Sequence, residues 1–203
     1  MKNNLVITIG RQFGSGGRAI GKMISEMLGI AYYDNELITE AAKLSGLSSD
    51  LLEQKDEKTP GSLRYALSLG FNLGPGFSSE ELYRIQSETI RKVASDGPCV
   101  IVGRSADYVL RSNSRCFNVF VQAPMEWRIE NILERDDEAD PRTIKEVVIK
   151  KDKSRASYYD FYTNKQWGYS TSYHLTVDSS VLGLEGTARM IIDFVKRAGG
   201  LDE

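Results

Sequence analysis

The first 28 residues carry the pattern that most restricts the fold. Residues 5–9 (Leu-Val-Ile-Thr-Ile) form an apolar and largely β-branched run, which is typical of a buried strand. Four glycines follow within eight positions, and apolar residues then recur from Ile20 to Leu28 at the spacing of one helical face. A strand, a glycine-rich loop and a helix in this order bring backbone N–H groups and the positive end of a helix to one point. We therefore expect an anion site here, and a nucleotide polyphosphate is its usual ligand.

The glycine-rich loop departs from the Walker phosphate loop at its end. The Walker pattern continues from its second glycine into a lysine and then a serine or threonine. If the second glycine is Gly16, Gly17 takes the place of the lysine and Arg18 takes that of the hydroxyl. The next register leaves Ala19 at the hydroxyl position. We expect Arg18 to supply the missing positive charge to the phosphates, with Arg11 as the nearby rival.

Seven residues are expected to form the phosphate loop: Gly10, Arg11, Gly14, Ser15, Gly16, Gly17 and Arg18. A tight strand-to-helix turn without a ligand is the alternative interpretation. Four glycines are more than such a turn needs, so the pattern favours phosphate binding.

Composition limits the class of protein. The chain of 203 residues suits one α/β domain, and its 26 basic and 28 acidic residues give a net charge of −2. This balance argues against a protein that coats nucleic acid. Cys99 and Cys116 each lie in or beside an apolar run, which indicates reduced core thiols, and the single histidine makes a histidine-based zinc site improbable. No apolar run is long enough to span a membrane and no signal-peptide pattern opens the chain, so we expect a cytoplasmic protein.

Four further segments read as strands: residues 30–33, 98–104, 116–121 and 173–178. They alternate with helical patterns, which indicates a parallel sheet with helices on both faces. Asp34 ends the second strand, where open α/β sheets bind ligands, although it would serve equally well to cap the following helix. Residues 45–79 are rich in glycine and proline, and we expect a mobile insertion there that closes over a substrate. A capping box at residues 78–81 opens the next helix.

The second half of the chain supplies charged and aromatic candidates. A helix that starts after Pro124 is expected to carry Arg128 and Arg135 on its outer side. A helix that restarts after residues 140–141 places Asp152, Arg155 and Tyr159 on one face. The aromatic residues at 158–162 and 167–169 favour packing at a helix end over stacking on a base, although Tyr159 could serve both purposes.

These motifs, taken together, resemble one known family. They are Ile-Gly-Arg-Gln-Phe-Gly-Ser-Gly-Gly-Arg at 9–18, Tyr-Tyr-Asp at 32–34, Val-Ile-Val-Gly-Arg at 100–104, Asp-Lys-Ser-Arg-Ala at 152–156, and the aromatic segment from Tyr158 to Trp167. Their order along nearly the whole chain resembles the cytidylate-kinase-like family of the nucleoside monophosphate kinases. The resemblance implies a three-layer P-loop NTPase fold with one five-stranded parallel sheet in the order 2-3-1-4-5. It also implies a single domain over residues 1–203, with the acceptor-side insertion at about 45–79 and a short lid at about 135–141.

The resemblance assigns roles to particular residues. Arg104 matches the arginine that binds the acceptor phosphate, and Asp152 and Arg155 match an acceptor-site motif. Arg128 and Arg135 lie where these kinases carry lid arginines. The expected acceptor-binding residues are Asp34, Arg104, Asp152, Arg155 and Tyr159, and the expected catalytic residues are Arg18, Arg104, Arg128, Arg135 and Arg155.

The chain also departs from the cytidylate kinases. The phosphate-loop lysine is absent, Ser105 stands where those kinases have an acid, and Glu40 lies about where they have an arginine. The expected function is ATP-dependent phosphoryl transfer to a nucleoside monophosphate, with CMP or dCMP as the suggested acceptor and Mg²⁺ held by the nucleotide phosphates. Two alternatives stay open: a kinase for another phosphorylated metabolite or coenzyme precursor, and a nucleotide-binding sensor without turnover. The sequence does not fix an oligomeric state.

Overall fold

In the computed structural model, residues 5–34, 79–135 and 139–201 are described. Their helices and strands, in chain order, are β1 (Val6–Arg11), α1 (Gly17–Leu28), β2 (Ala31–Tyr33), α5 (Ser79–Asp96), β3 (Cys99–Val102), α6 (Ala106–Val109), β4 (Cys116–Gln122), α7 (Met125–Leu133), α8 (Ile144–Thr163), the 3₁₀ turn η1 (Ser170–Ser172), β5 (Leu175–Asp178) and α9 (Ser179–Arg197).

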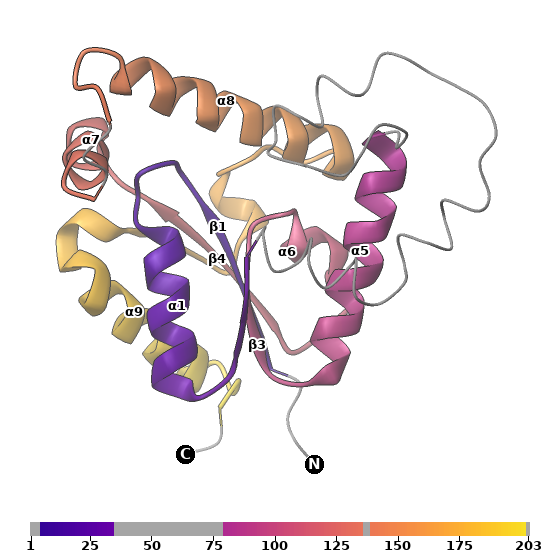
Figure 1. Cartoon of the computed structure of the whole chain (residues 1–203). Coiled ribbons are helices and arrows are strands. Elements are labelled where there is room, and N and C mark those ends of the chain that lie inside the picture. The colour runs from indigo at the N-terminus through magenta and orange to yellow at the C-terminus, as the bar shows by residue number, and fades with distance from the viewer. Residues whose placement is uncertain (1–4, 35–78, 136–138, 202–203) are drawn as a thin grey trace, which may run out of the picture.

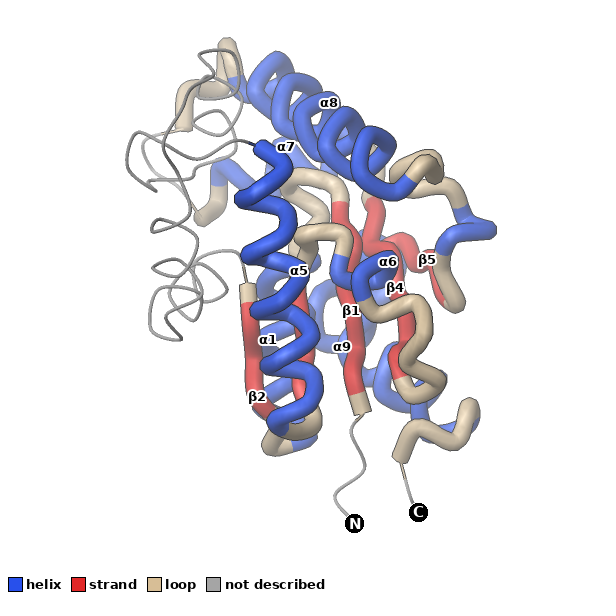
Figure 2. The backbone as a smooth tube through the Cα atoms, turned by 90° about the vertical axis from the view of Figure 1, so that its right-hand side faces the viewer, coloured by secondary structure: helices blue, strands red, loops and turns tan. Residues whose placement is uncertain are grey.

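The strands form one parallel sheet in the order β2-β3-β1-β4-β5, as the sequence predicted (Figure 1). β1 lies at its centre, where Ile7 pairs with Val100 of β3 and with Phe117 of β4. All carboxyl ends therefore meet at one edge of the sheet, and α8 lies across that edge (Figure 2). This edge is where open parallel sheets bind their ligands.

Helices cover both faces of the sheet, which gives three layers. α1 and α9 cover one face and share a core with alternate residues of β1, including Leu5, Ile7 and Ile9. α5 and α6 cover the other face, where Val6 and Ile101 are buried among residues of both helices. Because both faces of each central strand are buried, their sequences read as continuous apolar runs rather than as alternating ones.

The two turns at the carboxyl edge depend on unusual backbone conformations. Gly14 and Gly16 adopt left-handed φ values of 82° and 76° in the turn from β1 to α1. After β3, Gly103, Arg104 and Ser105 all have left-handed φ values, of 84°, 59° and 51°. Such values are uncommon for residues with a side chain, and they cluster at functional sites.

Several element boundaries and one residue differ from the sequence-based expectation. β3 ends at Val102, because the left-handed turn at Gly103 interrupts the expected strand, and β5 starts two residues later than expected, at Leu175. The expectation that Arg128 lies on the outer side of α7 is wrong: only 5% of this residue is exposed, because its side chain turns inward to a carboxylate.

Some expectations fall outside the described residues, namely the helix expected from residue 35, the insertion at 45–78 and residues 136–138 of the lid. Both cysteines are free and buried, as expected. None of the described helices has the length and apolar character needed to cross a membrane.

The close packing of α1 on the sheet generates a stability prediction. A Cβ atom on Gly21 would lie 2.8 Å from Val102 Cγ2 and 3.2 Å from Ile9 Cδ1, and both partners are fixed in the core. Gly21→Val should therefore lower the free energy of unfolding by about 1–3 kcal/mol, measured by urea denaturation. Gly97→Val is the control, since a Cβ atom there meets nothing within 4 Å, and a similar loss in both variants would contradict the prediction.

Candidate active site

Hydrogen bonds from the protein core hold the turn between β1 and α1 in place. The Ser15 hydroxyl is fully buried and donates to the carbonyl oxygens of Gln12 (2.9 Å) and Val121 (3.1 Å). The Ser179 hydroxyl donates to the carbonyl oxygen of Ser15 at 2.8 Å. The turn is therefore fixed from the side of the sheet, and it leads directly into the first residue of α1, where a helix attracts anions.

Side chains of α7 and α8 form hydrogen bonds with the same turn from its other side. Asp152 on α8 accepts a hydrogen bond from the backbone N–H of Phe13 at 2.7 Å, and its second oxygen accepts from Arg128 on α7. The Arg128 guanidinium also donates to the carbonyl oxygen of Phe13, and Asn131 Nδ2 donates to the carbonyl oxygen of Gly14. Asp152 and Arg128 thus form a buried pair that ties α7, α8 and the loop together.

A first cavity, which we call the inner cavity, opens beneath α8 and has a volume of about 360 Å³. Its lining comes from the ends of β1 and β3, from α6 and α8, and from the aromatic segment that follows α8: Thr8, Ile9, Gly10, Arg11, Phe13, Gly103, Arg104, Ser105, Asp107, Lys151, Ser154, Arg155, Tyr158, Tyr159, Trp167 and Tyr173. The cavity combines aromatic walls with a few polar groups, as small-molecule sites do.

Two polar groups of the inner cavity suit an acceptor molecule. Asp107 Oδ2 accepts a hydrogen bond from the Tyr159 hydroxyl at 2.7 Å. Burial raises the pKa of Asp107 above its ordinary value, against the hydrogen bond from Tyr159, which lowers it. The Ser105 hydroxyl is buried and has no hydrogen-bond partner within the described ranges. A buried carboxyl with a shifted pKa and a buried hydroxyl without a partner are both features of ligand sites.

A second cavity of about 460 Å³, the outer cavity, lies over the glycine-rich turn. Its lining residues are Arg11, Gln12, Phe13, Gly14, Gly16, Gly17, Arg18, Asp34, Ile132, Arg135 and Arg155. The positive end of α1 and several guanidinium groups face this space, so the outer cavity is suited to a polyphosphate.

The two cavities meet at three residues. Arg11, Phe13 and Arg155 belong to the lining of both. Arg155 donates to the carbonyl oxygen of Arg11 at 3.2 Å, and its guanidinium carbon lies 5.3 Å from the centre of the Phe13 ring. The two cavities are therefore neighbours, and their junction has two arginines and one aromatic ring.

The arginines of the junction and of the inner cavity perturb one another. Burial lowers the pKa of Arg104 to about 10, and the charge of Arg11 lowers it further. The pKa of Arg155 is lowered by burial and by Arg104, although Asp152 opposes the shift. Like charges that are partly removed from water in this way favour the binding of an anion between them.

Arg18 lines the outer cavity, where it pairs with a carboxylate. Its guanidinium is exposed and forms an ion pair of 2.7 Å with Asp34, whose side chain is buried. The Tyr32 hydroxyl lies 3.4 Å from Asp34 Oδ2. Asp34 is thus held at the carboxyl end of β2, on the wall of the outer cavity.

The structure brings most of the expected site residues together and distributes them between the two cavities. Arg104, Arg155 and Tyr159 line the inner cavity, whereas Arg18, Asp34 and Arg135 line the outer one. Asp152 and Arg128 contact the loop and each other. Among the lining residues that the sequence analysis did not expect in the site are Phe13, Asp107, Lys151, Trp167 and Tyr173. Asp107 could have been found, because it is an acid that follows Arg104 by three residues, just after the end of the third expected strand.

The residues present do not form a cage for a metal ion. Within the described ranges no group of three or more histidine, cysteine or acidic side chains could hold one. The Ser15 hydroxyl turns inward, and Asp34 is engaged by Arg18.

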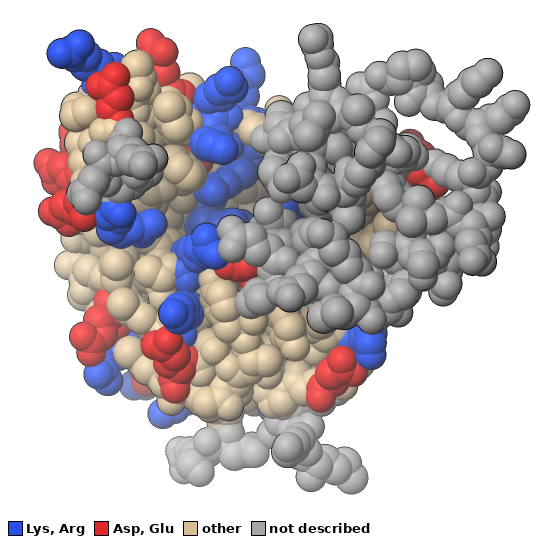
Figure 3. Space-filling view, viewed as in Figure 1, with Lys and Arg blue, Asp and Glu red and all other residues tan. Residues whose placement is uncertain are grey.

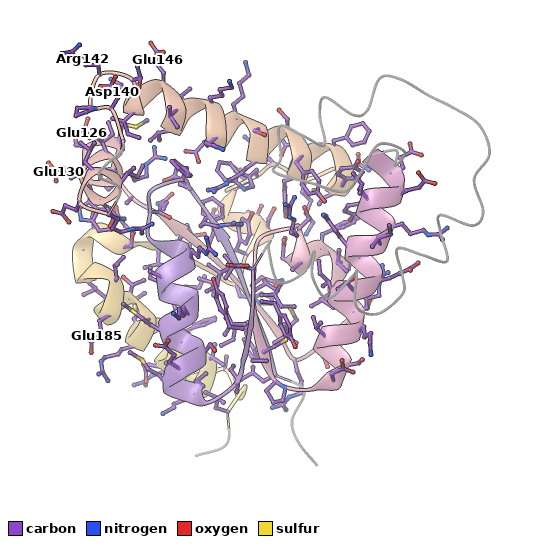
Figure 4. All side chains as sticks on the ribbon, in the orientation of Figure 1. Glu126, Glu130, Asp140, Arg142, Glu146 and Glu185 are labelled. Atoms are coloured by element: carbon purple, nitrogen blue, oxygen red, sulfur yellow. The ribbon has the colours of Figure 1, made fainter. Side chains whose placement is uncertain are left out.

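The surface charge agrees with this arrangement. Figure 3 shows lysine and arginine side chains gathered in a band that runs from α8 towards α1. Glu126 and Glu130 project outward from α7, away from the sheet (Figure 4). An anionic substrate would therefore meet positive charge at the cavities.

Comparison with known proteins identifies related sequences. The model of a family described as the cytidylate kinase-like family matches residues 6–181. A cytidylate kinase from Aeropyrum pernix is 29% identical over 190 residues, which are 92% of this chain and 96% of that protein. A cytidylate kinase from Methanococcus aeolicus is 25% identical over 190 residues, 92% of this chain and 95% of that protein.

Solved structures support the fold. An uncharacterized protein from Eubacterium ventriosum superimposes with a TM-score of 0.74 and 28% identity, over 96% of this chain and 99% of that one. A shikimate kinase from Acinetobacter baumannii, in complex with shikimate, gives a TM-score of 0.53 at 13% identity, over 97% and 96% of the two chains. The second likeness concerns the fold alone. Together with the strand order, these matches confirm the expected three-layer P-loop fold and the resemblance on which it was based.

The buried pair of Asp152 and Arg128 generates a testable prediction. Asp152→Ala would leave the Arg128 guanidinium, 6% exposed, without its carboxylate, and would free the Phe13 N–H. We expect a loss of about 3–5 kcal/mol in the free energy of unfolding, measured in urea. Glu185→Ala, which breaks the exposed pair with Arg189 at the molecular surface (Figure 4), should cost at most about 1 kcal/mol. Equal losses in the two variants would show that Asp152 does not hold the loop.

Proposed function

Because the chain belongs to the cytidylate kinase-like family, we propose that it transfers the γ-phosphoryl group of ATP to a nucleoside monophosphate, with CMP or dCMP as the acceptor. The relatives named as cytidylate kinases align with this chain over more than nine-tenths of its length, which supports the proposal. The enzyme class follows from the family, and the acceptor and the donor are the parts of the proposal that need a test.

The observation that carries the proposal is the meeting of two cavities at Arg11, Phe13 and Arg155. Direct phosphoryl transfer requires a donor and an acceptor that approach each other in line, with water excluded between them. The outer cavity, over the glycine-rich turn, would take the triphosphate of the donor. The inner cavity would take the acceptor, with its phosphate at the junction and its nucleoside beneath α8.

Each arginine then has a distinct task. Arg104 and Arg155 would bind the acceptor phosphate, since both line the inner cavity beside the junction. Arg18 and Arg135, on the outer cavity, would contact the donor phosphates. Arg128 and Asp152 are positioning residues, because they hold the loop through Phe13 rather than reach into either cavity. Mg²⁺, when bound with the nucleotide, would neutralise part of the charge on the phosphates.

Asp107 supports a cytosine acceptor over a uracil one. The exocyclic amino group of cytosine donates hydrogen bonds, whereas uracil presents a carbonyl oxygen at the same position. A carboxyl group retains an acceptor oxygen in either protonation state. Asp107 has one oxygen engaged by Tyr159, and its other oxygen would accept from the cytosine amino group.

A nucleotide sensor without turnover is the second candidate. Its support is specific: the loop lacks a lysine, and the Ser15 hydroxyl is committed to backbone carbonyls. The same assay separates the two candidates, because a sensor would bind ATP and release no ADP with any acceptor.

The kinase proposal predicts turnover that depends on Arg104. Nucleoside monophosphates are offered one at a time with ATP and Mg²⁺, and ADP release is followed. CMP or dCMP should be the best acceptor, and Arg104→Ala should lower kcat/KM for it roughly 10- to 100-fold, the value of a charge-assisted hydrogen bond. Arg91→Ala, on the exposed side of α5, is the matched control and should be unaffected. No turnover with any acceptor, despite ATP binding, would overturn the kinase proposal in favour of the sensor.

The role of Asp107 predicts a change in selectivity. An asparagine at this position keeps an acceptor oxygen and adds N–H donors that can pair with the uracil carbonyl. Asp107→Asn should lower the ratio of kcat/KM for CMP to that for UMP roughly tenfold, with KM for ATP unchanged. An unchanged ratio would remove Asp107 from the recognition of the base.

A further inference from the structure

The side chain of Arg11 lies against Gly17 and Gly103, and neither of these two positions has room for a side chain of its own. A Cβ atom on Gly17 would lie 2.5 Å from Arg11 Cβ and 3.0 Å from its Cγ, so the stem of Arg11 lies against the first residue of α1. A Cβ atom on Gly103 would overlap Arg11 Nη1 and lie 2.9 Å from its Cζ. The side chain therefore extends from the end of β1 to the end of β3, and these two glycines make its path possible.

The guanidinium of Arg11 has no close partner along this path. It forms no hydrogen bond or ion pair with any other residue of the described ranges. Burial and the charge of Arg155 lower the pKa of Arg11 to about 9, although the charge of Asp34 opposes the shift, so the group stays charged at neutral pH. A buried cation that no carboxylate contacts directly is unfavourable, unless a ligand supplies the opposite charge.

The position of Arg11 indicates which ligand group this is. Arg11 lines both cavities, and its guanidinium lies beside Gly103, which belongs to the lining of the inner cavity. We propose that Arg11 is a catalytic residue that binds the migrating phosphoryl group and does the work of the absent phosphate-loop lysine. This inference rests on the kinase function proposed above and assigns to Arg11 the role that the sequence pattern gave to Arg18.

The other arginines are less suited to this task. The Arg18 side chain is 59% exposed and is paired with Asp34 at 2.7 Å, so a phosphate would have to displace that carboxylate. Arg104 lines the inner cavity alone, and Arg135 lines the outer cavity alone. Arg155 shares the junction, but it is oriented by the Arg11 carbonyl oxygen and the Phe13 ring. Within the part of the chain that the structure describes, Arg11 is the junction arginine whose guanidinium makes no hydrogen bond.

The reaction needs a fixed charge at this place and no general base. An oxygen of the acceptor phosphate, already ionised at neutral pH, forms the new bond to the γ-phosphorus. The bond between that phosphorus and the bridging oxygen breaks, and its electron pair leaves with ADP. Negative charge leaves the attacking oxygen and builds up on the bridging oxygen, while the three equatorial oxygens of the γ-phosphoryl group remain charged, and a guanidinium with fixed orientation stabilises this arrangement.

The test compares three arginines changed to methionine. Arg11→Met keeps the apolar stem that packs against Gly17 and removes the guanidinium, Arg18→Met removes the rival, and Arg189→Met, on the exposed side of α9, is the control. With ATP, Mg²⁺ and the best acceptor, Arg11→Met should lower kcat roughly 10³-fold while KM for the acceptor changes little. Arg11→Lys should recover part of the rate, because an ammonium restores the charge but not the fork of donors.

A stability measurement separates this role from a structural one. If the Arg11 guanidinium serves the ligand, Arg11→Met should unfold at the same temperature as the wild type or at a higher one. If it holds the fold, the melting temperature should fall together with the rate. A fall in stability, or a greater loss of kcat in Arg18→Met than in Arg11→Met, would overturn the inference.

Binding measurements keep the inference testable if the wild type turns over no acceptor. In that case the kinase proposal fails, but a contact with the γ-phosphate remains measurable by calorimetry with ATP·Mg²⁺ and ADP·Mg²⁺. Arg11→Met should weaken ATP binding at least tenfold and ADP binding much less. Equal effects on the two nucleotides, or none, would show that Arg11 does not contact the transferred group.

Discussion

The site depends on one carboxylate, that of Asp152. Its two oxygens join a backbone N–H of the glycine-rich turn to a guanidinium of α7, and α8 carries it across the carboxyl edge of the sheet. A turn built from glycines has little intrinsic stiffness, since each glycine has wide conformational freedom. The buried Ser15 hydroxyl restrains the turn from the side of the sheet, and the pair of Asp152 and Arg128 restrains it from the side of the helices. The cavities keep their shape because this turn is fixed between sheet and helices.

The arginine cluster lowers the stability of the folded protein while the site is empty. Arg11, Arg104 and Arg155 lie close enough for their charges to lower one another's pKa, and burial lowers each further. Below these pKa values the folded protein carries charges that the unfolded chain would keep in water, so the cluster destabilises the empty site at neutral pH. A phosphate bound between the three guanidinium groups would reverse this effect. A site of this kind would have lower stability in exchange for affinity for an anion.

Local patterns predicted the architecture because they reflect local physics. The apolar run of β1, the glycine C-cap of α1 and the apolar face of α9 each specify an element without reference to the rest of the chain. The burial of Arg128 could not be predicted in this way, since it depends on Asp152, 24 residues away, and on how α7 packs against α8. The spacing of the glycines predicted that Arg18 lies just after the turn between β1 and α1. Its partner Asp34 follows another strand, β2, and the spacing could not predict this ion pair. The direction of a side chain depends on tertiary contacts, and the periodicity of a sequence carries no information about these contacts.

The left-handed turn after β3 has a consequence for how this protein would change under selection. Arg104 and Ser105 adopt φ values of 59° and 51°, which cost most residues about 1 kcal/mol each. Glycine and asparagine adopt this region more easily. A library selected for heat resistance alone would therefore drift towards these residues at position 104, and the inner cavity would lose the guanidinium of Arg104. If Arg104 has the role proposed above, a selection that also demands activity would retain the arginine.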